Sequence, residues 1–273
     1  MKLAFLPRLA AAVVIVALLG GAAYIVFRER APSSQAVVVD EGSMTRDAPL
    51  EAVTQQRIFF GHMSVGGNIL SGLDEVYRAS GVAPPTMVEI APREAPTLPT
   101  GGVLVHAPIG PNAQPLEKLA NFDTTLRGGL ADQVEIAALK FCYVDIRWDS
   151  DIEALFASYR ETLARLEADY PEVRFVHMTV PLTTGASGIR DRAKVLVGRD
   201  DNATRERYNA MMRDAYGPDR VFDLAALEAT EPDGVLREWQ LFAGYSSDGG
   251  HLNDAGAAHV AAGLIGVLAA DQG

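Results

Sequence analysis

Continuous apolar segments, each the length of a strand, alternate with amphipathic segments the length of a helix across residues 51–270. The predicted strands cover residues 57–61, 86–90, 136–146, 174–180 and 220–224, and the predicted helices cover residues 65–79, 115–128, 151–169, 203–216 and 254–270. Strands that are apolar throughout are typical of strands buried on both faces. Their alternation with helices favours an α/β fold, in which helices cover both sides of a mainly parallel, five-stranded sheet.

The predicted helix over residues 151–169 carries the clearest local signals. Ser150 and Glu153 have the spacing of a capping box, and Pro171 follows the predicted end. Between them lies one apolar stripe at helical spacing, made of Ile152, Leu155, Phe156, Tyr159, Leu163 and Leu166.

Residues 9–27 form an uninterrupted apolar stretch, which Lys2 and Arg8 precede. Its length approaches the ~20 residues that cross a hydrocarbon core, which predicts a membrane anchor. A cleavable signal peptide is the alternative, because Gly21 and Ala23 offer small residues for processing after Ala23.

These features predict three regions. We expect a signal anchor or signal peptide over residues 1–28, a polar linker over residues 29–50 and one folded domain over residues 51–273. The domain is expected to be membrane-anchored on the extracytoplasmic (periplasmic) side, or secreted if the segment is cleaved.

Charge, motifs and cysteine content exclude several function classes. The formal net charge is −11; the first 30 residues carry +3 and the remainder −14, so nucleic acid is not an expected partner. The sequence has no glycine-rich nucleotide motif and no histidine–carboxylate pair at metal-ligand spacing, so no cofactor or metal is expected.

The single Cys142 excludes an intrachain disulfide. It is read as a small buried core residue or as a catalytic thiol.

Near the C-terminus, Asp248 precedes His251 by three residues in a glycine-rich loop ahead of the last predicted helix. A carboxylate at this spacing can hold an imidazole in one tautomer and leave its other nitrogen free to act as a base. The alternative is that Asp248 caps a turn and His251 caps the final helix. His106, His177 and His259 lie in apolar segments and are predicted to be core or helix-face residues.

Ser64 lies at a predicted strand-to-helix corner, in the segment Gly61-His62-Met63-Ser64. A nucleophile is displayed at such corners, where unpaired N–H groups of the helix N-terminus can also stabilise an oxyanion. A helix cap is the alternative reading of Ser64. The 108–112 loop, Asp145 and Pro181 follow strands or apolar segments, so they are expected at the same edge of the sheet as Ser64.

The order of an early serine and a late Asp248-Gly-Gly-His251 resembles the SGNH/GDSL hydrolase superfamily, and Gly61-His62-Met63-Ser64 resembles its first block with the usual Gly-Asp-Ser altered. The resemblance covers residues 55–270 and implies a flavodoxin-like α/β/α sandwich. It also implies that Ser64 is the nucleophile, His251 the base and Asp248 its orienting partner.

The same resemblance implies two further oxyanion donors beside the backbone N–H of Ser64: a glycine backbone, for which Gly110 is the candidate, and an asparagine side chain, for which Asn112 is the candidate. The later Gly-x-Asn-Asp block reads Cys142-Tyr143-Val144-Asp145, so Val144 stands at the expected asparagine. Asn112 shapes a turn in the alternative reading. His62 and Asp145 are candidate substrate-binding residues; alternatively, His62 packs at the corner and Asp145 pairs with Arg147.

Together these observations predict an exported serine esterase. Its expected substrates are acyl esters, O-acetyl groups included, of cell-envelope carbohydrate or lipid. Two alternatives remain open: a non-catalytic SGNH-like module that binds envelope glycans, and an O-acyltransferase that uses the same triad.

Overall fold

The computed structural model describes residues 47–186, 188–236 and 238–270. The predicted anchor or signal segment and residues 29–46 of the predicted linker lie outside the described residues. Within the described ranges, no helix is long and apolar enough to span a bilayer. A helix begins at Ala48, so residues 48–50, predicted as the end of the linker, are helical.

A parallel sheet of six strands forms the centre of the fold, in the order β2-β3-β1-β4-β5-β6. The bounds are β1 Arg57–His62, β2 Thr86–Glu89, β3 Val103–Pro108, β4 Ile136–Leu139, β5 Arg174–Met178 and β6 Val221–Phe222. Without the edge strand β2, the remaining strands β3-β1-β4-β5-β6, renumbered along the chain, have the flavodoxin-like order 2-1-3-4-5. Proteins with this order bind ligands at the carboxyl ends of the strands, where the strand order reverses beside the first strand. The predicted parallel α/β class is confirmed.

The predicted number of five strands is wrong, because β3 was not among the predicted strands. Its apolar run is interrupted by His106 and ends at Pro108, which hides the strand in the sequence. The predicted strand over residues 136–146 is also too long. It ends at Leu139, and Tyr143–Asp145 form a short 3-10 turn.

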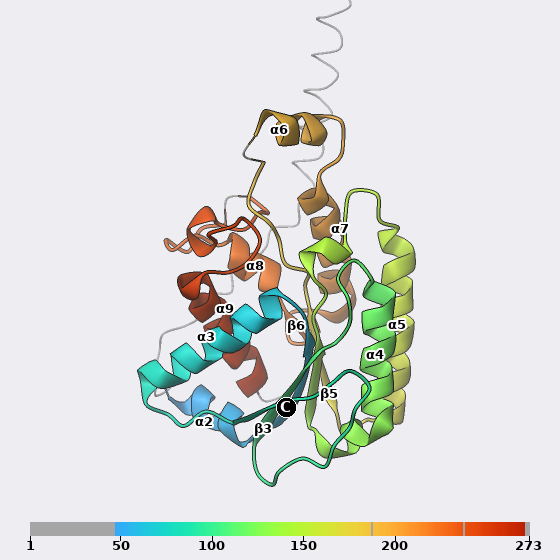
Figure 1. Ribbon diagram of the computed structural model, residues 1–273, viewed down its shortest axis with the longest axis vertical. Coiled ribbons are helices and arrows are strands. Elements are labelled where there is room, and N and C mark those ends of the chain that lie inside the picture. Colours follow the sequence, from blue (N-terminus) through green and yellow to red (C-terminus); the bar gives the residue numbers. More distant parts are fainter. Residues whose placement is uncertain (1–46, 187, 237, 271–273) are drawn as a thin grey trace, which may run out of the picture. The chain divides into compact units, whose positions relative to one another are not determined.

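Helices cover both faces of the sheet (Figure 1). One core cluster joins the sheet to α4, α5 and α7, and a second joins it to α2, α3, α8 and α9. The bounds are α2 Ala48–Gln55, α3 Val65–Ser80, α4 Pro115–Thr125, α5 Ile152–Asp169, α6 Ile189–Leu196, α7 Asp201–Tyr216, α8 Leu224–Ala229 and α9 Asp254–Ala269. The sequence analysis did not anticipate α2, α6 and α8, which are each eight residues or shorter.

The cap of α5 differs from the expected capping box. Asp151 is the N-cap, and its side chain accepts a hydrogen bond from the Ala154 N–H at 3.0 Å. The Ser150 hydroxyl instead accepts one from the Arg147 N–H. Serine and aspartate are both good N-caps, and the predicted cap, Ser150, is one residue before the observed one.

Helices α3 and α9 pack closely along one face of the sheet. Gly72 makes this possible, because a Cβ on that residue would lie 2.2 Å from the Ala257 carbonyl oxygen. The N-terminal ends of these two helices adjoin the chain segments that carry Ser64 and His251. Their packing therefore positions the candidate site.

Candidate functional site

Ser64 lies between the carboxyl end of β1 and the first turn of α3, as the sequence predicted for a displayed nucleophile. Its backbone has φ 54° and ψ −109°, a conformation that non-glycine residues rarely adopt and that costs ~1–3 kcal/mol. The side chain makes no capping hydrogen bond to the helix. The strained backbone thus turns the hydroxyl away from the capping role that was its alternative reading.

The structure brings Ser64, His251 and Asp248 together from opposite ends of the domain. Ser64 Oγ is 2.6 Å from His251 Nε2, and His251 Nδ1 is 2.6 Å from Asp248 Oδ2. These two contacts use both nitrogens of the imidazole. With the Nδ1 proton donated to the carboxylate, Nε2 is free to accept the serine proton.

Asp248 also caps the turn that leads to His251. Its Oδ1 accepts hydrogen bonds from the backbone N–H groups of Gly250 at 2.9 Å and His251 at 2.8 Å. These bonds, followed by the bond from the imidazole, hold the pKa of the carboxyl well below its usual range. Asp248 therefore both caps the turn and contacts the imidazole.

Three contacts hold the His251 loop against its surroundings. The Leu252 N–H donates to the Asn68 side chain in the first turns of α3, and the Ser246 hydroxyl donates to the His251 carbonyl at 2.6 Å. The Thr184 N–H donates to the Gly249 carbonyl at 2.9 Å, which ties the loop after β5 to the same segment. The imidazole is therefore held from both sides.

Gly110 and Asn112 lie in the loop after β3, next to the β1–α3 corner. The Ile109 N–H donates to the His62 carbonyl, so this loop continues the pairing of β1 with β3 up to the residues before Ser64. Asn112 is exposed, and its carbonyl oxygen accepts a hydrogen bond from Lys118 Nζ at 3.4 Å. That contact leaves the amide N–H groups of Asn112 available to donate.

The side chain of Asp145 has no exposed surface, so it cannot contact a substrate as predicted. It pairs with Lys118 Nζ at 2.6 Å rather than with Arg147. Its carboxylate also accepts hydrogen bonds from the N–H groups of Ala113 at 2.8 Å and Cys142 at 2.6 Å. Asp145 thereby fastens the Gly110 loop to the turn after β4.

We expect Lys118→Met to lower the free energy of unfolding by about 3–5 kcal/mol, because it leaves a carboxylate buried without its counter-ion. Urea denaturation measures the change. The control is Arg78→Met, which breaks the exposed Arg78–Glu75 pair and should change the free energy of unfolding far less, because water screens an exposed pair. Equal losses in the two variants would contradict a structural role for the buried pair.

His62 packs at the corner and does not reach a substrate. Its ring is buried, stacks on Phe60 with centroids 4.9 Å apart, and places Nε2 3.2 Å from Nδ1 of His106. Burial, followed by the charges of His106 and Lys140, lowers the pKa of His62 to about 3. The packing alternative therefore describes His62, and His251 is the histidine that contacts Ser64.

This depressed pKa predicts acid sensitivity. Below about pH 6.5 the unfolded chain binds a proton at His62 that the folded protein excludes, so stability is complete above that pH and falls as pH drops towards about 3. The slope from this group is at most about 1.4 kcal/mol per pH unit. The free energy of unfolding, measured by urea denaturation between about pH 7 and 5, should fall less steeply with decreasing pH in His62→Phe than in the wild type. Parallel slopes would contradict the prediction.

Tyr143 belongs to the site, although the sequence analysis did not select it. Its ring meets the His251 imidazole edge to face, with centroids 6.0 Å apart, and Gly250 lies against it. Burial and the Asp248 charge raise the pKa of the Tyr143 hydroxyl. The signal in the sequence was its position inside the altered Gly-x-Asn-Asp block, directly before Val144.

The remaining candidates lie apart from Ser64 or are enclosed. Cys142 is fully buried, in agreement with its reading as a core residue.

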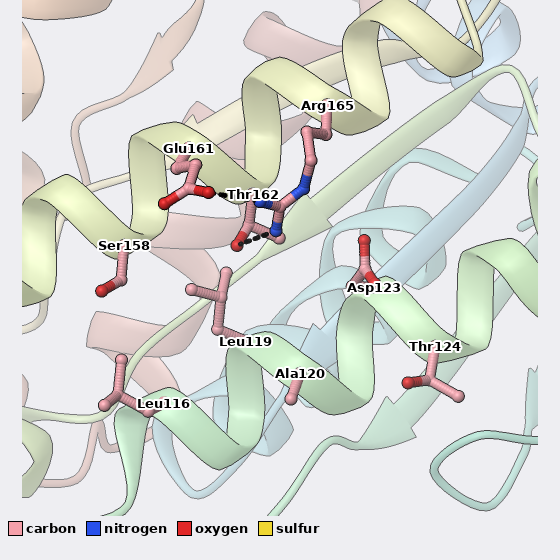
Figure 2. Close-up of a pocket in the computed structure, with 9 residues that line it drawn as sticks. All are labelled: Leu116, Leu119, Ala120, Asp123, Thr124, Ser158, Glu161, Thr162 and Arg165. Carbon is pink, nitrogen blue, oxygen red and sulfur yellow. Dashed lines mark hydrogen bonds and ion pairs between the residues drawn. The ribbon is translucent and has the colours of Figure 1, made fainter.

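A pocket of about 360 Å³ lies between α4 and α5, but none of the triad residues lines it (Figure 2). Among the described residues, no three His, Cys, Asp or Glu side chains are grouped so that they could hold a metal ion.

No protein-family model matches this chain, and no curated protein matches it. Solved structures do resemble it. A protein provisionally described as a platelet activating factor from Streptococcus pneumoniae is 18% identical, with a TM-score of 0.48 over 82% of this chain and 88% of its own. A protein provisionally described as lipolytic and of the G-D-S-L family, from Desulfitobacterium hafniense, is 13% identical, with a TM-score of 0.43 over 78% and 99%.

The lipopolysaccharide acetyltransferase periplasmic domain of Salmonella ser. Paratyphi A is 11% identical, with a TM-score of 0.41 over 80% of this chain and 86% of its own. The structures that this chain resembles therefore include a G-D-S-L lipolytic protein and an acyltransferase periplasmic domain, at low sequence identity.

Proposed function

We propose that this protein is a serine-dependent esterase that cleaves acyl esters through a covalent acyl-serine. One observation carries the proposal: Ser64 Oγ, the His251 imidazole and the Asp248 carboxylate form a continuous chain with two 2.6 Å contacts. This is the arrangement in which a base activates a hydroxyl while a carboxylate fixes the tautomer of the base.

In the proposed reaction, His251 Nε2 takes the Ser64 proton as Oγ bonds to the ester carbonyl carbon. The carbonyl π electrons move to its oxygen and form an oxyanion. When the oxyanion collapses, the alkoxide leaves and takes the proton from His251, and the acyl group stays on Ser64. A water molecule then repeats the sequence, which releases the acid and restores the serine.

The oxyanion needs donors beside Ser64. The backbone N–H groups of Ser64 and Gly110 have no hydrogen-bond acceptor among the described residues, and they belong to neighbouring loops at the carboxyl edge of β1 and β3. Unpaired N–H groups at this position suit a developing negative charge. We propose these two donors, with Asn112 as the side-chain donor in place of the asparagine that Val144 replaces.

The role of Asn112 can be separated from a role in folding. Removing a donor that acts only in the transition state should lower kcat and kcat/KM together by about 10²–10³, with KM nearly unchanged. Steady-state kinetics and a thermal melt of Asn112→Ala test this. A normal kcat with a lowered Tm would identify Asn112 as a turn residue and leave the oxyanion to backbone donors.

For the substrate, we propose acyl esters of cell-envelope carbohydrate, O-acetyl groups first, with lipid esters second. This proposal rests on the apolar N-terminal stretch of residues 9–27, which predicts a domain anchored on the extracytoplasmic side or secreted. The altered first block and Val144 favour one alternative, a glycan-binding module without activity. An O-acyltransferase with the same triad is the second alternative.

A covalent probe separates these functions most directly. A fluorophosphonate reacts with an activated serine, so we expect it to label the full chain at Ser64. In a separate assay, the unlabelled chain should release p-nitrophenol from p-nitrophenyl acetate. A binding module would do neither. An acyltransferase would be labelled, but it would transfer acetyl to a sugar acceptor in preference to water. Mass spectrometry of the labelled peptide identifies the site.

A further inference from the structure

Tyr143 contacts the base of the triad at two consecutive residues. The centroids of its ring and of the His251 imidazole are 6.0 Å apart, and the two ring planes are inclined by 75°. A Cβ added at Gly250 would lie 2.9 Å from both Cζ and the hydroxyl oxygen of Tyr143, so the outer end of the tyrosine packs on the backbone of this glycine. The aromatic ring therefore forms a wall beside the imidazole and beside the chain that leads to it.

Arg205 fixes the turn that carries Tyr143. Its Nε donates hydrogen bonds to the carbonyl groups of Tyr143 at 2.8 Å and Ile146 at 3.2 Å, and its Cζ lies 5.7 Å from the centroid of the Tyr143 ring. Arg205 is buried and also donates to the Thr183 hydroxyl at 3.1 Å, in the loop after β5. The wall is therefore anchored to α7, on a different part of the fold from the His251 loop.

The proposed reaction changes what holds the imidazole. Before attack, Asp248 Oδ2 contacts Nδ1 and Ser64 Oγ contacts Nε2, each at 2.6 Å. Once Oγ carries the acyl group, it has no proton to donate, and Nε2 must take a proton from water instead. The imidazole then keeps one hydrogen bond within the triad. Because the χ2 torsion of histidine is broad, the ring needs another contact to stay aimed, and Tyr143 is in place to supply it.

We propose that Tyr143 is a positioning residue for the second half of the reaction, in which water releases the acyl group. This inference rests on the proposed esterase function. In that step, His251 Nε2 takes a proton from water while the water oxygen bonds to the acyl carbon. The bond from that carbon to Ser64 Oγ then breaks, Oγ receives the proton from Nε2, and the acyl group leaves as its acid. Tyr143 exchanges no atom or proton; it keeps Nε2 directed at the water.

The ring of Tyr143, and not its hydroxyl group, carries this role. Burial, followed by the Asp248 charge, raises the pKa of the hydroxyl, so it stays protonated at neutral pH and cannot act as the base itself. Tyr143→Phe keeps the ring that meets the imidazole, whereas Tyr143→Leu removes it. A comparison of these two variants separates positioning by the ring from chemistry by the hydroxyl.

Pre-steady-state kinetics of the full chain in detergent, with p-nitrophenyl acetate, would measure the two halves of the reaction separately. The burst of p-nitrophenol reports acylation, and the slower steady state reports release of the acyl group. In Tyr143→Leu we expect kcat to fall by about 10²-fold, the loss that a small misplacement of a catalytic group can cause. The value of kcat/KM, which covers only the steps up to the acyl-serine, should change by less than about threefold. Tyr143→Phe should restore kcat.

Two controls exclude a general loss of structure. Tyr170→Leu removes a half-buried tyrosine at the C-terminal end of α5 and should leave both halves of the reaction unchanged. Hydroxylamine attacks an ester with little help from a base, so it should speed acyl release in Tyr143→Leu more than in the wild type. If Tyr143→Leu does not fold, Tyr143→Met provides the same comparison, because methionine is flexible and fills irregular space without a rigid ring.

Four results would overturn this inference while wild-type turnover upheld the proposed function. They are an equal fall of kcat and kcat/KM in the folded ring-deleted variant, an unchanged kcat in that variant, a loss of the same size in Tyr143→Phe, and the absence of rescue by hydroxylamine. A wild-type chain that a fluorophosphonate does not label and that releases no p-nitrophenol would overturn both the inference and the proposed function.

Discussion

Ser64→Ala should lower kcat for p-nitrophenyl acetate by about 10⁶-fold, the loss expected where a serine and a histidine act as one unit. The alanine removes the oxygen that contacts His251 Nε2, while the backbone at residue 64 and the helix behind it keep their packing. His251→Ala should cause a loss of the same size. The double variant should lose no more than either single variant, because neither residue can act without the other.

The matched control is Ser71→Ala. Ser71 lies on the same helix, is exposed, and bonds only to the Gly67 carbonyl, so turnover should stay near the wild-type value. Circular dichroism and a thermal melt would show that all variants are folded. If folded Ser64→Ala retained wild-type turnover, the nucleophile would lie elsewhere in the chain.

Asp248→Asn should lower kcat by about 10⁴-fold while the fold is preserved. The amide oxygen can still accept the N–H groups of Gly250 and His251, so the turn is kept. The amide nitrogen, however, would donate to His251 Nδ1 in place of the present carboxylate contact at 2.6 Å. The imidazole would then carry its proton on Nε2, where it cannot accept the proton of Ser64.

Asp254→Asn is the control, because Asp254 is an exposed carboxylate three residues after His251, in the first turn of α9. It removes the same charge from the same region without a contact to the imidazole. Steady-state kinetics over a range of pH would compare the two variants. Wild-type kcat in folded Asp248→Asn would reduce Asp248 to a turn cap.

The sequence predicted those parts of the site whose geometry is local. A buried strand followed by a glycine-rich helix start placed Ser64 at a corner, and a three-residue spacing joined Asp248 to His251. The parallel arrangement of the sheet then predicted that both segments meet at one edge. Each step uses residues close in sequence or the simple periodicity of strands and helices.

The rest of the site depends on contacts between segments distant in sequence. Lys118 is one position of an amphipathic helix, and nothing local shows that it is fully buried against Asp145, 27 residues away. Tyr143 is likewise placed by a 3-10 turn that replaces the second half of a predicted strand. Arg147 was the expected partner of Asp145 because it is near in sequence. The packing of α4 instead buries Lys118 against Asp145.

The close contact at Gly72 affects the positions of Ser64 and His251, although Gly72 touches neither residue. Ser64 and His251 precede the first turns of two helices that touch where Gly72 meets the Ala257 carbonyl. A side chain at residue 72 would have to push α3 and α9 apart at this contact, and we expect the serine and the imidazole to separate with them. The alignment of Ser64 with His251 thus depends on the absence of a methyl group at residue 72, about two helical turns from Ser64.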